Sequence, residues 1–403
     1  MQMKKIRYLD LFAGCGGLSE GFESTKKYEI VSAVEWEKVP LNTLCNRLKF
    51  KYNVNNAEDI CLNFDIQRTD ELFNGWNDEK YGSSLGLKNI LGQKKVEFII
   101  GGPPCQAYSI AGRIRDKNGM KDDYRNYLFE SYIRVVSLVK PDLIVFENVP
   151  GMLSAKPNGV NIVDRIQKEF NKNGYEILDN LNDALIDVSD YGVPQVRKRV
   201  IIIGIKKGLF NNNQKILQSF YKNYLPKYKK TKRSVRDAIG DLPKLIPCVS
   251  GDKVFYHGAN SIYSDHNPRF HNIRDMKIFS KLAFDIDSGA NIYATADSIK
   301  ELYYKETGKK SNIHKYHVLL WDQPSTTIVS HLHKDGLRHI HPDYEQARTI
   351  TIREAARLQS FPDDFEFLGN QGDKYKMIGN AVPPLFANSL ANALYDFYND
   401  NFI

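Results

Sequence analysis

The run VEFIIGGPPCQAYSI, residues 96–110, sets the architecture of this chain and points to its chemistry. Its first five residues are mostly apolar and β-branched, which is typical of a buried strand. Two glycines end the strand, and Pro103 and Pro104 stiffen the turn because a proline ring fixes the backbone angle φ. The pattern places Cys105 at the carboxyl end of a strand, the edge at which open α/β sheets carry their functional groups.

The thiol of Cys105 has two interpretations. A single cysteine after a turn is usually a buried structural residue. Here the prolines fix the direction of the thiol in advance, and the polar residues Gln106 and Ser109 follow it closely. Together with three further motifs, this loop favours a nucleophile over a structural cysteine.

Patterns typical of strands and helices alternate along the first half of the chain. We expect strands at residues 6–12, 28–34, 96–100, 143–146, 175–181 and 200–205, and a strand-like element that ends at residues 59–60. We expect helices at residues 18–24, 40–50 and 127–139, and a polar insertion at residues 62–95. Strands that alternate with helices predict an α/β fold with a parallel sheet and right-handed crossovers. The pattern fades after residue 205 and returns as a helix at residues 352–359.

Composition limits the class of protein. The chain has 403 residues, of which 42% are hydrophobic and 26% charged, as in a globular protein large enough for two domains. It has no apolar run near the ~20 residues that span a bilayer, and its N-terminus does not resemble a signal peptide. Its five cysteines have no Cys-x-x-Cys spacing, which argues against a disulfide framework and a zinc site. We expect a cytoplasmic protein without a metal ion and without a membrane contact.

Basic residues are concentrated in one segment. Residues 206–236 contain eight Lys, two Arg and no acidic residue, whereas the formal net charge of the whole chain is +8. Aromatic residues lie between these charges. A solvated surface explains most charge runs, but a run of one sign with interleaved aromatics is also typical of a surface that follows nucleic-acid phosphates. The segment alone does not distinguish the two.

A glycine-rich loop follows the first expected strand in DLFAGCGGLSEGF, residues 10–22. Gly14, Gly16 and Gly17 allow a ligand to approach the backbone at the N-terminus of a helix. Glu35 ends the second strand about 20 residues further on, where such folds bind a ribose hydroxyl. The spacing Gly-x-Gly-Gly differs from the pyrophosphate-binding Gly-x-Gly-x-x-Gly, so it favours a nucleoside ligand without a diphosphate.

Two further residues extend this expected nucleoside site. Trp36 is a candidate to stack on an adenine ring, and Asp59 a candidate to accept a hydrogen bond from the exocyclic amine of that ring. The alternatives are that Trp36 packs in the core and that Asp59 caps a helix. The order Glu35, Trp36, Asp59 favours the ligand-binding interpretation.

Two more motifs place charged residues at strand ends. Glu147 follows four consecutive apolar residues, so a surface ion pair explains it poorly. The carboxyl end of its strand faces the same crevice as Cys105. Arg197 and Arg199 stand two apart on an apparent strand and therefore point to one face. Simple pairing with a phosphate or a carboxylate is the alternative for these arginines.

The chain resembles the DNA (cytosine-5)-methyltransferases of the bacterial restriction-modification type. Six motifs match in the family's order: residues 10–22, 101–109, 147–149, 195–199, 353–362 and 379–384. Tyr108 in place of a more usual Phe and a long insertion at residues 62–95 depart from the family pattern. The resemblance implies a Rossmann-like, S-adenosylmethionine-dependent methyltransferase sheet with a smaller target-recognition domain. The expected catalytic domain is discontinuous, residues 1–205 plus 378–403, and residues 206–377 form the expected recognition domain.

The resemblance also implies the reaction. Cys105 adds to carbon 6 of a flipped-out cytosine, so that carbon 5 can take the methyl group of S-adenosyl-L-methionine. Glu147 is expected to bind or protonate nitrogen 3 of the ring. Arg197 and Arg199 are expected to hold the carbonyl oxygen of the base and to support the charge of the thiolate. The implied cofactor-binding residues are Phe12, Gly14, Gly16, Gly17, Leu18, Glu35, Trp36, Asp59, Ile60, Pro103, Asn380 and Val382.

The implied substrate is double-stranded DNA, which favours phosphate binding by the basic segment. We expect a monomer, with a cognate restriction endonuclease as a genetic rather than a physical partner. The nearest alternative is the branch of the family that methylates transfer RNA, which the long recognition segment and the lack of a Cys-Phe-Thr motif disfavour. A catalytically silent DNA-binding regulator is a further alternative. The intact Cys105, Glu147, Arg197 and Arg199 disfavour it.

Overall fold

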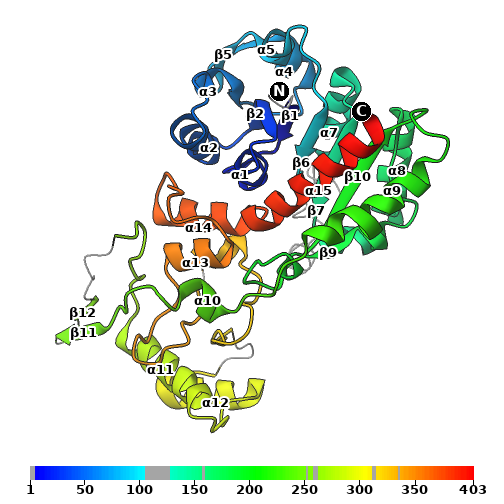
Figure 1. Ribbon diagram of the computed structural model, residues 1–403. Helices are drawn as coiled ribbons and strands as arrows, with labels where there is room; N and C mark the ends of the chain where they lie inside the picture. Colours follow the sequence, from blue (N-terminus) through cyan, green and yellow to red (C-terminus); the bar gives the residue numbers. More distant parts are fainter. Residues whose placement is uncertain are drawn as a thin grey trace. The chain divides into compact units, whose positions relative to one another are not determined.

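The computed structural model describes residues 5–104, 128–156, 159–250, 253–256, 262–310, 315–334 and 336–403. The chain forms two compact units (Figure 1). The sheet unit contains Met1–Gly192, Arg197–Thr231 and Ala381–Ile403, and the small unit contains Val193–Val196 and Lys232–Asn380. The sequence places the first boundary at residue 205, whereas residues 206–231 pack in the sheet unit.

The sheet unit is built on an eight-stranded sheet with the order β3-β2-β1-β6-β7-β10-β8, and β9 pairs with β10, within the described part of the chain. The strands are β1 (Ile6–Leu11), β2 (Tyr28–Glu35), β3 (Cys61–Asn63), β6 (Phe98–Gly101), β7 (Leu143–Asn148), β8 (Tyr175–Glu176), β9 (Leu185–Asp187) and β10 (Lys198–Lys206). The neighbours from β3 to β7 pair in parallel. The strand order reverses between β1 and β6, and a ligand crevice forms at such a switch point, outside the carboxyl ends of the two strands.

The expected parallel sheet is wrong at β10, which is antiparallel to β7, β8 and β9. Residues 188–197 connect β9 to β10, and this connection is shorter than the dozen or more residues that a parallel crossover needs. β10 therefore begins beside the carboxyl end of β7. Val200 pairs with Asn148 at that end, and Ile205 pairs with Leu143 at the other.

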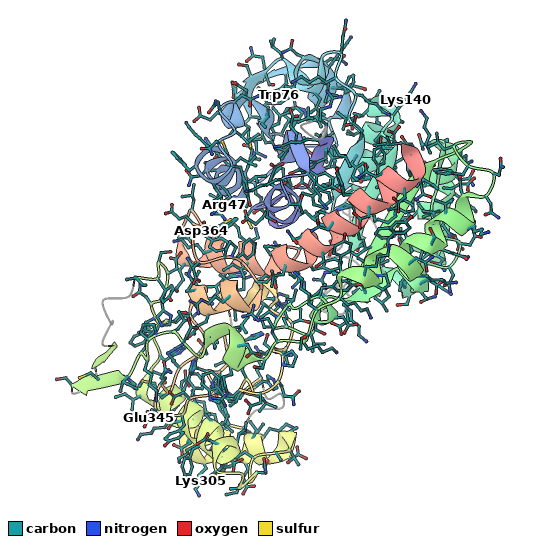
Figure 2. All side chains as sticks on the ribbon, in the orientation of Figure 1. Arg47, Trp76, Lys140, Lys305, Glu345 and Asp364 are labelled. Carbon is teal, nitrogen blue, oxygen red and sulfur yellow. The ribbon has the colours of Figure 1, made fainter. Side chains whose placement is uncertain are left out.

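Helices enclose the buried strands of the sheet unit. They are α1 (Gly17–Ser24), α2 (Lys38–Lys51), α3 (Ala57–Ile60), α4 (Thr69–Asn74), α5 (Gly86–Leu91), α7 (Leu128–Val139), α8 (Ile162–Lys172), α9 (Asn213–Ser219) and α15 (Pro384–Phe402). α1 packs closely on α15, because a Cβ atom at Gly21 would lie 2.3 Å from the Cβ atom of Ala387. Arg47 of α2, labelled in Figure 2, pairs with Glu20 of α1 at 2.7 Å, and both side chains are buried. These contacts join both ends of the chain to one core.

Two expected strands differ from the structure. Residues 59–60 end the short helix α3, and β3 begins directly after them at Cys61. The strand expected at residues 175–181 is reduced to β8. The insertion at residues 62–95 forms α4, α5 and a small hairpin of β4 (Trp76–Asp78) and β5 (Gly82–Ser84). Trp76 stacks on Phe64 with the ring centroids 4.1 Å apart, which ties the hairpin to the chain after β3.

The small unit consists of α10 (Val235–Ile239), β11 (Pro247–Ser250), β12 (Lys253–Tyr256), α11 (Ile273–Asp287), α12 (Ala296–Thr307), α13 (Ile352–Leu358) and α14 (Gln371–Asn380). Apolar side chains of α11 and α12, including Phe279 and Leu302, form its core. The expected helix at residues 352–359 is confirmed as α13, which begins with a capping box between Thr351 and Glu354. Among the described residues, none of the helices combines the length and apolar character that crossing a membrane requires.

Candidate active site

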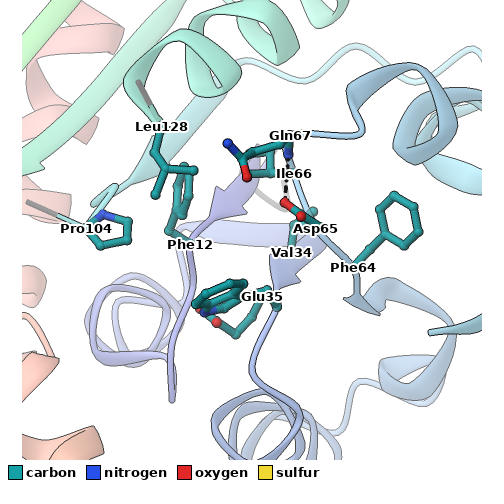
Figure 3. A pocket seen from close by; sticks show the side chains of 10 residues that line it. Phe12, Val34, Glu35, Phe64, Asp65, Ile66, Gln67, Pro104 and Leu128 are labelled. Carbon is teal, nitrogen blue, oxygen red and sulfur yellow. Dashed lines mark hydrogen bonds between the residues drawn. The ribbon is translucent and has the colours of Figure 1, made fainter. Parts of the chain in front are cut away.

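A pocket opens at the switch point of the sheet, where β1, β2 and β6 end (Figure 3). The empty space among its lining atoms is about 360 Å³, a volume that includes the part open to solvent. Its lining residues are Phe12, Val34, Glu35, Trp36, Phe64, Asp65, Ile66, Gln67, Pro104 and Leu128. The lining is mainly apolar and aromatic, with a few polar groups that can orient a ligand.

The loop between β1 and α1 has a backbone conformation that few residue types adopt. Phe12 (φ 58°), Gly14 (φ 56°) and Gly16 (φ 87°) all lie in the left-handed region. A Cβ atom at Gly17 would lie 2.3 Å from the carbonyl oxygen of Val382, so only glycine fits there. At Gly14, apart from its two chain neighbours, no atom of the described residues lies within 4 Å of the corresponding position. The loop is therefore closely packed at its end and open at Gly14, where a ligand can approach the backbone.

Glu35 is buried at the end of β2 and is held by two backbone donors. The N–H group of Gly14 donates to its Oε2 atom (2.9 Å), and the N–H group of Glu37 donates to its Oε1 atom (2.9 Å). Burial raises the pKa of the Glu35 carboxyl above its ordinary value, and these hydrogen bonds oppose the shift. A carboxylate offers about four acceptor positions, so Glu35 can fix the glycine loop and still accept from a ligand hydroxyl.

Trp36 lines the pocket with 47% of its surface exposed, so it is not a core residue. Asp59 is exposed on α3 and is not among the lining residues. Asp65 lines the pocket instead, and its Oδ1 atom accepts from the N–H group of Gln67 at 3.0 Å (Figure 3). The pair Asp-Ile occurs at residues 59–60 and again at residues 65–66, and only the second of these two pairs follows a strand. Of these two aspartates, Asp65 therefore lies at the pocket and Asp59 does not.

The start of the cysteine loop lies between two parts of the site. A Cβ atom at Gly102 would lie 2.7 Å from the Oε2 atom of Glu147. Pro104 lines the pocket, whereas Pro103 is buried and does not line it. Cys105 itself lies outside the described residues. Of the residues that directly precede the thiol, Gly102 thus lies beside the Glu147 carboxylate and Pro104 lies at the pocket.

Glu147 and Arg199 form an ion pair on neighbouring strands. The Nε atom of Arg199 lies 2.8 Å from the Oε1 atom of Glu147, and only 12% and 13% of the two side chains are exposed. Burial lowers the pKa of Arg199, and the Glu147 carboxylate opposes this shift. Arg197 is fully buried, and its Nη2 atom donates to the carbonyl oxygen of Ala381 (3.1 Å). Arg199 therefore lies beside Glu147, while Arg197 fixes the chain in front of α15.

The remaining expected cofactor residues do not line the pocket. Leu18 is buried on α1, Ile60 is buried at the end of α3, and Val382 is buried beside Gly17. Asn380 is exposed at the end of α14 in the small unit. The sequence analysis missed the lining residues Val34, Phe64, Asp65, Ile66, Gln67, Pro104 and Leu128. No sequence signal marks these residues, because apolar lining residues look like core residues and the strand that precedes Asp65 is evident only in the structure.

Two motif residues hold the small unit together. Gln195 is fully buried, accepts at Oε1 from the N–H group of Ile328 (2.9 Å) and donates through Nε2 to the carbonyl oxygen of Leu358 (3.2 Å). Arg353 is also buried and donates to the Oγ atom of Ser264 (2.7 Å). These side chains join segments that are far apart in the sequence, so the motifs at residues 195–199 and 353–362 include architectural positions.

Comparisons with known proteins were made for the whole chain. The family model for C-5 cytosine-specific DNA methylases matches residues 6–396. The type II methyltransferase M.Bpa9945I of Bacillus paralicheniformis is 33% identical over 97% of this chain and 99% of its own length. The type II methyltransferase M.DdeI of Desulfomicrobium norvegicum is 31% identical over 99% of this chain and 91% of its own length. An E. coli protein assigned as a DNA modification methyltransferase encoded within a prophage has a solved structure with a TM-score of 0.65 and 25% identity, covering 98% of this chain and 100% of its own.

Proposed function

The chain belongs to the family of C-5 cytosine-specific DNA methylases, and on that premise we propose how its residues methylate cytosine. It is a type II DNA (cytosine-5) methyltransferase of the restriction-modification type. The observation that supports the proposal is a pair of features at one edge of the sheet unit. These are the aromatic-lined pocket and the buried Glu147–Arg199 ion pair. The first fits a nucleoside cofactor, and the second fits a nucleobase.

We propose that the pocket binds S-adenosyl-L-methionine, which supplies the methyl group. Glu35 accepts hydrogen bonds from the ribose hydroxyls, because its carboxylate is fixed at the pocket and keeps acceptor capacity. The exposed indole of Trp36 stacks on the adenine ring. Asp65 accepts from the exocyclic amine of adenine, in the position that the sequence assigned to Asp59. The open backbone at Gly14 gives the cofactor close access to the chain.

The proposed reaction uses the Cys105 thiolate as a nucleophile. The thiolate adds to carbon 6 of cytosine, and carbon 5 gains the electron pair with which it would take the methyl group; the bond between that methyl group and the donor sulfur breaks, and S-adenosyl-L-homocysteine leaves. A water molecule accepts the proton on carbon 5, and the electron pair of the broken carbon–hydrogen bond restores the ring double bond as the thiolate is expelled from carbon 6. Glu147 binds nitrogen 3 and lowers the energy of the charge that the addition creates. Arg199 orients Glu147 through their ion pair and donates to the carbonyl oxygen of the base.

The proposed substrate state is a cytosine flipped out of a DNA duplex. A base inside the stack cannot reach a buried carboxylate, so the duplex must release it at a cost of a few kcal/mol. We further propose that the enzyme acts as a monomer in the cytoplasm, and that a restriction endonuclease for the same sequence is its genetic partner. Residues 232–380 of the small unit are the proposed location of sequence recognition.

Transfer of tritium from methyl-labelled S-adenosyl-L-methionine tests this proposal. The purified protein is incubated with duplex DNA and, separately, with transfer RNA, and the labelled nucleoside is identified after hydrolysis. We expect 5-methylcytosine from DNA. Label in transfer RNA alone would identify the other branch of the family, and the absence of label from both would favour a silent DNA-binding regulator.

A further inference from the structure

The lysine-rich segment that begins at Lys206 starts at the edge of the sheet opposite the candidate active site. β10 begins at the site, where Ile201 pairs with Glu147, and runs away from it to Lys206. The N–H group of Lys206 donates to the carbonyl oxygen of Asp142, which precedes β7. Lys140, labelled in Figure 2, lies at this same edge. At about 3.3 Å per strand residue, Lys206 is roughly 17 Å along β10 from the level of Glu147.

The segment then returns along α15 toward the site. Its contacts, in chain order, are Phe210 with Phe402 (ring centroids 5.1 Å apart), Tyr224 with Asp400 (3.0 Å) and Tyr228 with Asp396 (2.5 Å). Lys230 of the segment pairs with Tyr191, and Tyr191 packs on Phe386 near the start of α15. The sixteen positions from Phe402 to Phe386 correspond to about 24 Å of helix at 1.5 Å per residue. The interleaved aromatics therefore anchor the segment to α15, and they do not form an exposed stacking surface.

Two lysines of the segment, Lys229 and Lys230, lie at the site edge. The N–H group of Lys230 donates to the carbonyl oxygen of Asp190 (2.8 Å), and the Nζ atom of Lys229 lies 3.3 Å from the Oδ2 atom of Asp190. The same loop contacts the start of β10, because the N–H group of Val188 donates to the carbonyl oxygen of Arg197 (2.9 Å). Lys229 and Lys230 are thus one loop away from the arginine motif, and both are exposed.

We propose that Lys229 and Lys230 bind DNA phosphates next to the target cytosine, and that Lys206 and Lys207 do not contact the DNA. The inference rests on the proposed function, since a flipped base that reaches Glu147 brings its flanking phosphates to the same edge of the sheet unit. The ion pair of Lys229 with Asp190 does not prevent this. Both partners are partly exposed, and such pairs contribute little, so a phosphate can replace the carboxylate.

Two double variants with the same change in charge test the proposal. Lys229→Gln with Lys230→Gln changes the site edge, and Lys206→Gln with Lys207→Gln changes the far edge. Dissociation constants for a duplex that the wild type methylates are measured at several salt concentrations. The slope of log affinity against log salt is negative, and each lost phosphate contact makes it less steep by about 0.9. We therefore expect the slope to flatten by about 1.8 for the first variant and to stay unchanged for the second. The methylated sequence should stay the same in both, because phosphate contacts position the protein and do not read bases.

The outcomes separate this inference from the proposed function. Equal changes of slope in the two variants, or a larger change at the far edge, would overturn the inference while methylation by the wild type continued. A wild type that transfers no methyl group to DNA would instead contradict the proposed function. The thermal midpoints of both variants are compared with that of the wild type. If the double variant at the site edge does not fold, the single variants Lys229→Gln and Lys230→Gln are measured instead. Each should make the slope of log affinity against log salt less steep by about 0.9.

Discussion

At the scale of single residues, Glu35 connects the fold of the glycine loop to the proposed cofactor site. Its two oxygens accept from Gly14 and from Glu37, so the side chain that would bind the ribose also holds the loop beside it. A substitution therefore removes a ligand contact and loosens the loop that the ligand approaches. The same residue carries a structural and a binding role because both use the same carboxylate.

Glu35→Ala should weaken the binding of S-adenosyl-L-methionine by about 1–3 kcal/mol, the range for a lost hydrogen bond to a charged group. This corresponds to a rise in Kd of roughly 5-fold to 150-fold. Isothermal titration calorimetry of the wild type and the variant measures this Kd. Glu35→Gln keeps the shape and one acceptor, so its effect should be smaller. An unchanged affinity in the alanine variant would make Glu35 a purely structural residue.

The two Asp-Ile pairs provide a second residue-scale prediction. Asp65→Asn should weaken cofactor binding because the amide offers one acceptor and adds donors where the adenine amine also donates. Asp59→Asn should leave the affinity unchanged, because Asp59 is exposed and is not a pocket residue. The two variants are matched in chemistry and are compared by the same calorimetric titration. The reverse result would return the position to Asp59 and contradict the pocket assignment.

The buried carboxyl of Asp10 should make the stability of the protein depend on pH. It is buried under the glycine loop and accepts from the hydroxyl of Ser19 (2.6 Å), and burial raises the pKa of its carboxyl to about 7. Between its unfolded pKa near 4 and this value, the folded state binds more protons than the unfolded state, so the contribution of Asp10 to stability falls as pH rises. Asp10→Asn removes this contribution. The melting temperature of the variant relative to wild type should therefore increase from pH 5 to pH 8, and a constant difference would contradict it.

At the scale of elements, the contact between α1 and α15 closes the sheet unit. A Cβ atom at Gly21 would lie 2.5 Å from backbone atoms of Ala387 and Asn388, besides its contact with the Ala387 side chain. Gly21→Ala should therefore destabilise the protein by about 1–3 kcal/mol, the usual cost of overpacking, measured as the free energy of unfolding in urea. Adding Ala387→Gly should not restore stability, because the backbone remains in the way. Full rescue would show that the two helices separate easily.

The sequence predicts the elements better than it predicts their direction. The strands β1, β2, β6 and β7 are expected at nearly their observed positions, because long apolar runs that alternate with helical patterns leave little choice. The reversal of β10 was not predictable, since the periodicity of a strand is the same in both directions. It follows from the length of the connection between β9 and β10, and β9 itself has no clear sequence pattern.

The sequence predicted the site residues that lie in recognisable motifs. It missed those that reach the site only through their position in the folded sheet. The pocket contains Phe12, Glu35 and Trp36, as the motifs indicate. Asp65 was missed because an identical Asp-Ile pair precedes it, and only the observed strand β3 distinguishes the two pairs. The aromatics of the basic segment are consistent with a phosphate-binding surface in the sequence, because composition does not show that α15 packs against them.

At the scale of the whole molecule, the chain is a DNA (cytosine-5) methyltransferase whose central proposed step is a covalent bond between Cys105 and the target base. DNA with 5-fluorocytosine at the target position tests it most directly. The fluorine replaces the proton on carbon 5 that must leave, so the thiolate cannot be expelled after methyl transfer. With S-adenosyl-L-methionine present, wild-type protein should form a complex with this duplex that survives denaturing electrophoresis, and Cys105→Ser should not. If Cys105→Ser still methylated ordinary DNA, or if an active wild type formed no such complex, the covalent mechanism would be contradicted.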